Sequence, residues 1–153
     1  MKTLLTVIAL GLATASAVVA ADKPRGDSYI PGLGEFMIAA QMHHAKLWFA
    51  GSAGNWDLAA YELDELKEGF GDAARLHPKH EGIPVGAMIQ QNLGPPLAEL
   101  GKVIDRKNLD DFKPSFDRLS AACNTCHAGA AHEFIRIVRP TQPPATNQIY
   151  SPR

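Results

Sequence analysis

The sequence predicts an all-α protein: an antiparallel four-helix bundle over residues 33–135, followed by an extended C-terminal tail. Three observations predict this fold. Apolar residues recur at spacings of three and four in four separate segments, no segment has the strict alternation of a β-strand, and glycine or proline separates the segments. Helices of similar length joined by short connections pack as antiparallel neighbours around one core.

The first 20 residues have the composition of a secretory signal peptide. Lys2 precedes an apolar run, residues 4–12, and small residues follow up to the expected cleavage site after Ala20 or Ala21, although Ala17 also fits. The run is shorter than the roughly 20 residues that a transmembrane helix needs, so we expect export to the periplasm without stable membrane insertion.

Cleavage at this site would leave about 130 residues, the size of one domain with a single core. The chain has 15 basic and 16 acidic residues, and Lys2 is the one charged residue in the first 20, so the mature formal charge is −2. This balance gives no indication of the strongly basic surface with which proteins bind nucleic acids, so we expect no nucleic-acid partner.

A polar leader, residues 21–32, precedes the first predicted helix, residues 33–50, which Gly51 and Gly54 are expected to end. Two neighbouring apolar stripes run along this helix, so we expect most of its surface to be buried. The stripes consist of Phe36, Ala40, His43 and Leu47, and of Met37, Gln41, His44 and Trp48.

The second helix has the clearest periodicity, with apolar residues at spacings of three and four from Trp56 to Ala73 and charged residues between them. Asn55 is expected to cap its N-terminus through its side-chain oxygen. Pro78 is expected to end it, because proline lacks the N–H group that continues the hydrogen-bond ladder.

A third helical region, residues 85–106, contains the tripeptide Gly94-Pro95-Pro96. Internal proline removes a backbone hydrogen bond and its ring meets the preceding turn. We therefore expect a break, with one piece ending near Leu93 and a second beginning at the prolines.

The fourth helix begins after Asn108, a predicted N-cap, and carries Asp110 and Asp111 at the positive end of its dipole. One apolar stripe then continues along its whole length and includes the two cysteines. Its members are Phe112, Phe116, Leu119, Cys123, Cys126 and Ala130. Four prolines among polar residues follow in residues 136–153, which predicts a tail without a further helix.

Both cysteines of the chain fall in the pentapeptide Cys123-Asn124-Thr125-Cys126-His127, and C-x-x-C-H is the attachment motif of c-type haem. A redox-active dithiol would need a βαβ context, and a zinc site would need two further ligands at a matching spacing. The sequence therefore predicts one covalent haem c. Cys123, Cys126 and His127 are the cofactor-binding residues, and His127 is the metal ligand.

The position of this motif, late on the last of four helices, resembles the cytochrome c-prime family, the class II c-type cytochromes. The resemblance covers the four-helix layout and residues 119–127, including Ala122 before Cys123. It implies a monohaem bundle with the covalent haem on the last helix. It also implies a sixth iron position that is either open or filled by a methionine of the first helix, and homodimers that pair through the first two helices.

No methionine follows His127, so a sulfur ligand to the iron would have to come from an earlier helix. Met42 is the first candidate, and Met37, His43 and His44 are alternatives that one helical turn would exchange. Met42 is equally expected as a core residue, and His44 as a hydrogen-bonded one. We expect surface positions for His77, His80 and His132, and core positions against the haem for Trp48 and Trp56.

These features predict a periplasmic electron-transfer cytochrome that exchanges electrons with a redox partner protein and is not itself an enzyme. Two alternatives stay open. An open sixth position would suit a protein that binds nitric oxide or carbon monoxide. A haem subunit of a larger dehydrogenase complex would use the proline-rich tail as its contact.

Overall fold

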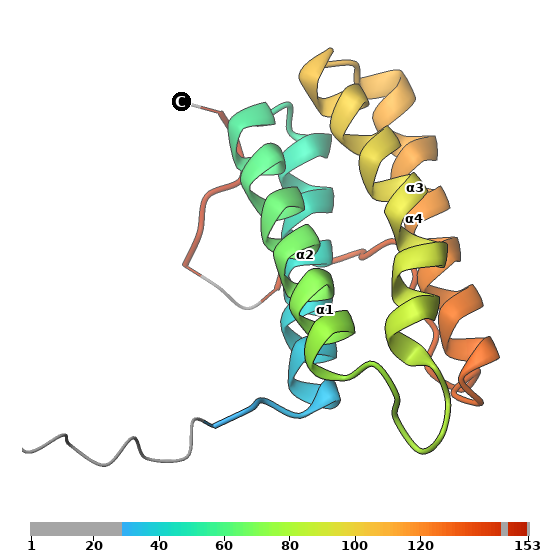
Figure 1. The fold of residues 1–153 in the computed structure, drawn as a ribbon. Helices are drawn as coiled ribbons and strands as arrows, with labels where there is room; N and C mark the ends of the chain where they lie inside the picture. Colours follow the sequence, from blue (N-terminus) through green and yellow to red (C-terminus); the bar gives the residue numbers. More distant parts are fainter. Residues whose placement is uncertain (1–28, 145–146, 153) are drawn as a thin grey trace, which may run out of the picture.

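The computed structural model describes residues 29–144 and 147–152. These residues form four helices and no strand: α1 (Leu33–Ser52), α2 (Trp56–Leu76), α3 (Val85–Asp105) and α4 (Leu109–Gly129). Successive helices run in opposite directions and pack against each other (Figure 1). The predicted all-α four-helix bundle is confirmed. The predicted signal peptide, residues 1–20, and residues 21–28 of the leader lie outside the described part of the chain.

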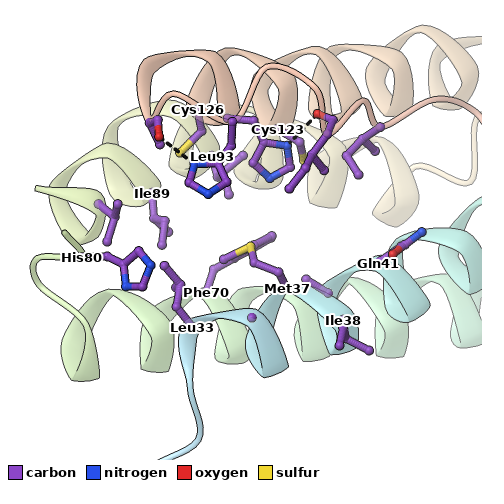
Figure 2. Close-up of a pocket in the computed structure, with 18 of the residues that line it drawn as sticks. Leu33, Met37, Ile38, Gln41, Phe70, His80, Ile89, Leu93, Cys123 and Cys126 are labelled. Atoms are coloured by element: carbon purple, nitrogen blue, oxygen red, sulfur yellow. Dashed lines mark hydrogen bonds between the residues drawn. The ribbon is translucent and has the colours of Figure 1, made fainter. Parts of the chain in front are cut away.

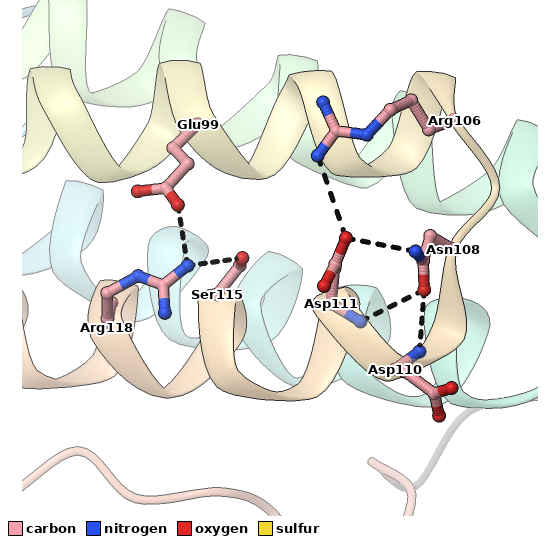
Figure 3. A network of polar contacts seen from close by, with 7 residues as sticks. All are labelled: Glu99, Arg106, Asn108, Asp110, Asp111, Ser115 and Arg118. Atoms are coloured by element: carbon pink, nitrogen blue, oxygen red, sulfur yellow. Dashed lines mark hydrogen bonds and ion pairs between the residues drawn. The ribbon is translucent and has the colours of Figure 1, made fainter.

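The two predicted N-caps are confirmed. Asn55 accepts a hydrogen bond from the N–H of Leu58 at 3.3 Å at the start of α2. Asn108 accepts from the N–H groups of Asp110 and Asp111 at 3.0 and 3.1 Å at the start of α4 (Figure 3). Each cap satisfies amide groups that have no partner within the helix, which explains why both helices begin where the sequence indicates.

The predicted break in the third helix is wrong, because α3 continues through Pro95 and Pro96. The flanking residues Leu93 and Leu97 are 3% and 6% exposed and face the core, whereas Pro95 faces solvent. An internal proline costs about 3 kcal/mol, but burial of each leucine contributes about 1.5–3 kcal/mol. The carbonyl groups that lose a hydrogen-bond donor at exposed positions can bind water instead. Burial of the two leucines therefore keeps α3 continuous.

α1 is less buried than its apolar composition predicts, since Ile38 is 70% exposed. The helix also extends past Gly51 to Ser52, and the chain reverses at Gly54, whose φ is +73°. Contrary to the expectation from the sequence, Gly51 does not end the helix but allows α4 to approach α1 closely, because a Cβ at this position would overlap the ring of Phe112.

The core is filled unevenly along the bundle. Where α1 ends and α4 begins, aromatic rings fill the space between the helices, and the centroids of Trp48 and Phe116 are 5.0 Å apart. Polar pairs add to the contact between α3 and α4, where Arg118 donates to Glu99 at 2.6 Å (Figure 3). Among the four pairs of neighbouring helices, α1 and α4 make the fewest contacts. At the other end of the bundle this separation leaves a cavity.

The chain after α4 forms no further helix within residues 131–144 and 147–152. It runs from the end of α4 towards the side of the bundle formed by α1 and α2 (Figure 1). Arg139 lies 4.3 Å from the ring of Trp48, and the rings of Tyr150 and Phe49 are 5.6 Å apart. The described part of this segment therefore packs on its own bundle. None of the helices in the described ranges has the length and apolar composition to span a bilayer.

Candidate functional site

A cavity of about 470 Å³ occupies the end of the bundle where α1 begins and α4 ends. Its wall is mainly apolar and includes side chains from all four helices, from the α2–α3 connection and from the segment after α4. Figure 2 shows Met37 and Phe70 on one side of this space and Cys123 and Cys126 on the other. The volume lies in the range of sites for cofactors and small molecules, roughly 300–1,000 Å³.

Cys123 and Cys126 lie nearly one turn apart on α4, and both line the cavity as free thiols. Burial raises the pKa of both thiols, that of Cys123 to about 12, with a further contribution to Cys123 from the neighbouring Cys126. Redox-active C-x-x-C thiols have the opposite property, a pKa lowered by a helix N-terminus or by nearby positive charge. This pair sits in the last turns of its helix, so the geometry does not suit a dithiol oxidoreductase.

His127 also lines the cavity, and its Nδ1 lies 3.1 Å from the main-chain carbonyl oxygen of Ile135. A carbonyl oxygen only accepts, so Nδ1 carries the ring proton and Nε2 keeps a free lone pair. Metal-ligating histidines typically have this arrangement, with one ring N–H held by a carbonyl or carboxylate. The ring of His127 is therefore in the tautomer that an iron ligand requires.

The packing of α1 against α4 brings Met37 to the level of His127. His44 Nε2 on α1 lies 2.8 Å from Ser120 Oγ on α4. Met37 precedes His44 by seven residues, and His127 follows Ser120 by seven residues. Because the two helices are antiparallel, these two steps lead in the same direction along the bundle (Figure 1). Seven residues make almost two full turns, which returns each side chain to the same face. Met37 lines the cavity, and its side chain points into it (Figure 2).

The other candidates for a second ligand are excluded by their positions or partners. Met42, the first candidate, is 41% exposed and does not line the cavity. His43 faces α2, where its Nδ1 lies 2.7 Å from the carboxylate of Glu62.

His44 lines the cavity, and its Nε2 forms a hydrogen bond inside the bundle. Nε2 of His44 lies 2.8 Å from Ser120 Oγ, and the same hydroxyl lies 3.1 Å from the carbonyl oxygen of Phe116. Burial also lowers the pKa of His44 to about 4, which keeps the ring neutral at physiological pH. The expected hydrogen-bonded core histidine is the interpretation that fits.

Two histidines that the sequence assigned to the surface line the cavity: His80, in the α2–α3 connection, and His132, after α4. Figure 2 shows His80 at the edge of the cavity. Ile135 and Ile137 line it as well. No local pattern predicts this, because loop residues reach the cavity only through the arrangement of the whole bundle.

The two tryptophans pack against the core, as expected, but not at the cavity. The rings of Trp48 and Trp56 lie 6.1 and 6.0 Å from that of Phe112, at the filled end of the bundle. Neither of them lines the cavity.

The residues at the cavity suit a covalent haem, which needs two thiols on one wall, an imidazole with a free Nε2 beside them and an apolar enclosure. Within the described ranges, no group of three or more His, Cys, Asp or Glu side chains is arranged to hold a metal ion by itself. Comparisons of this chain with protein-family models, with curated proteins and with solved structures found no match.

Proposed function

We propose that this protein is a monohaem c-type cytochrome that transfers electrons. Cys123 and Cys126 would hold the haem through thioether bonds, and Nε2 of His127 and Sδ of Met37 would bind its iron. One observation carries this proposal: Met37 and His127 stand at the same level of α1 and α4, on a cavity that both cysteines also line.

The haem would supply the one-electron chemistry, and the chain would tune it. An apolar wall disfavours the more highly charged oxidised centre, and a methionine ligand opposite a histidine raises the reduction potential further. The carbonyl of Ile135 orients the imidazole of His127 and increases its basicity, and this lowers the reduction potential.

Electron transfer is favoured over catalysis because a side chain is available on each axial side, which leaves no position for a substrate at the iron. The signal-peptide composition of residues 1–20 supports a periplasmic location, and the natural partner is then a periplasmic redox protein. The four-helix arrangement, with the motif at the end of α4, supports a relationship to the cytochrome c-prime family.

The test is a spectrum and a mass measurement of protein matured in a host that attaches haem c. We expect one covalent haem, a low-spin ferric spectrum with a methionine-to-iron charge-transfer band, and reversible one-electron exchange with a soluble mediator. The double variant Cys123→Ser/Cys126→Ser should carry no covalent haem.

A colourless wild-type protein of apo mass, with both thiols free, would refute the proposal. A high-spin ferric spectrum would instead indicate an open sixth position and would favour the binding of nitric oxide or carbon monoxide.

A further inference from the structure

The segment that follows α4, residues 131–139, reverses direction and returns along that helix; we call it the strap. The reversal uses Ala131, whose φ is +58°, and a hydrogen bond from the N–H of His132 to the carbonyl of His127 at 2.8 Å. The left-handed conformation costs a residue with a Cβ about 1 kcal/mol, so contacts elsewhere in the strap must hold the turn.

Asn124, which lies between the two cysteines, holds the strap with both polar atoms of its side chain. Its Nδ2 donates to the carbonyl of Ile137 at 2.8 Å, and its Oδ1 accepts from the N–H of Ile137 at 2.7 Å. The side-chain amide thus satisfies both backbone groups of Ile137, as a neighbouring β-strand would.

A second anchor lies two residues further along the strap. Arg139 donates to both carboxylate oxygens of Asp117, through Nε at 3.2 Å and Nη2 at 2.6 Å, while its guanidinium lies over Trp48. A two-point pair of this kind fixes orientation as well as distance. With the turn at one end and two anchors at the other, Ile135 is held so that its carbonyl meets Nδ1 of His127.

We propose that Asn124 is a positioning residue for His127. Asn124 holds the strap, the strap holds the carbonyl of Ile135 against His127, and this contact sets the reduction potential of the haem. The inference rests on the proposed function. The bond from Nδ1–H to the Ile135 carbonyl makes Nε2 a better donor, which stabilises the oxidised iron. Releasing the strap at Ile137 weakens that bond, and the potential rises.

The motif itself offers a matched control. Thr125, next to Asn124, donates to the carbonyl of Ala121 at 3.1 Å within its own helix. Asn124→Leu keeps the branched shape of the side chain and removes both polar atoms, whereas Thr125→Ala changes the motif without touching the strap.

We expect Asn124→Leu to shift the equilibrium between the oxidised and reduced protein about tenfold, an upward shift of about 59 mV for one electron. The backbone amide of Ile137 should exchange with solvent at least about tenfold faster, because its acceptor is gone. Thr125→Ala should leave both quantities close to wild type. Equal results for the two variants would overturn the inference, and so would faster exchange with an unchanged potential.

A second variant leaves α4 intact. Ile137→Pro removes the N–H group that donates a hydrogen bond to Asn124, and Ile137→Val keeps it. Only the proline variant should therefore raise the reduction potential. If Asn124→Leu fails to acquire haem, the comparison of Ile137→Pro with Ile137→Val tests the role of the strap instead. A wild-type protein without haem would refute the proposed function. A haem-loaded wild type whose potential neither Asn124→Leu nor Ile137→Pro changes would refute only the role of the strap.

Discussion

The side chain of His44 forms a hydrogen bond with the hydroxyl of Ser120 at 2.8 Å, and both residues are 6% exposed. This bond lies inside the bundle and sets how α1 is aligned with α4. The rings of Trp48 and Phe116, one turn further along the two helices, pack against each other at a tilt of 49° and follow the same alignment. A contact between two core residues therefore determines which residue of α1 faces His127.

Replacing Met37 should abolish the methionine signature of the iron. Met37→Ala is expected to give a high-spin ferric spectrum, to lose the charge-transfer band and to lower the reduction potential, because no sulfur remains opposite His127. Met42→Ala, on the exposed side of α1, is the control and should keep the wild-type spectrum. Loss of the band in the Met42 variant alone would contradict the alignment.

The stability of the protein should fall on the acid side because of His44. Burial lowers the pKa of His44 to about 4, while the unfolded chain titrates near 6.5. Between these values the unfolded state binds the extra proton, so the free energy of unfolding decreases as the pH falls through this window, by about 2 kcal/mol from pH 7 to pH 5. Urea unfolding of the wild type and of His44→Gln should show this dependence in the wild type and a flatter curve in the variant. Parallel curves would contradict it.

Two glycine substitutions should have opposite effects on thermal stability. Gly51→Ala places a methyl group inside the ring of Phe112 and should destabilise the protein by about 1–3 kcal/mol through overpacking. Gly69→Ala, within α2 and with no atom within 4 Å of the new Cβ, should stabilise it by about 0.5–1 kcal/mol through helix propensity. Thermal unfolding monitored by circular dichroism distinguishes the two, and a stabilised Gly51→Ala variant would show that α1 and α4 are further apart.

Glu62 on α2 is fully buried and depends on His43 for its hydrogen bond at 2.7 Å, with Lys46 Nζ 3.7 Å away. His43→Leu should therefore cost about 3 kcal/mol of unfolding free energy, because a buried carboxylate loses its donor. Adding Glu62→Met should recover most of this loss, since an apolar pair of similar volume needs no compensation. Urea denaturation of the two variants measures the difference, and a double variant no more stable than the single one would contradict the role of the pair.

Local chemistry explains why some boundaries were predictable. Asn55, Asn108 and Pro78 act within one turn of the backbone, so their effects can be predicted from neighbouring residues alone. The effect of Pro95 and Pro96 on α3 could not be predicted in this way. It depends on whether Leu93 and Leu97 are held in the core, and that is a property of the neighbouring helices.

The sequence by itself determined which residues would hold the proposed haem, because Cys123, Cys126 and His127 lie within five consecutive residues of one helix and their relative placement is set by helical geometry. Only the tertiary structure decided that Met37 rather than Met42 faces them, and that the carbonyl of Ile135 holds the imidazole. Periodicity places a side chain around the axis of its own helix. What lies opposite that side chain depends on the alignment of two helices far apart in the chain, and contacts such as His44 with Ser120 set that alignment.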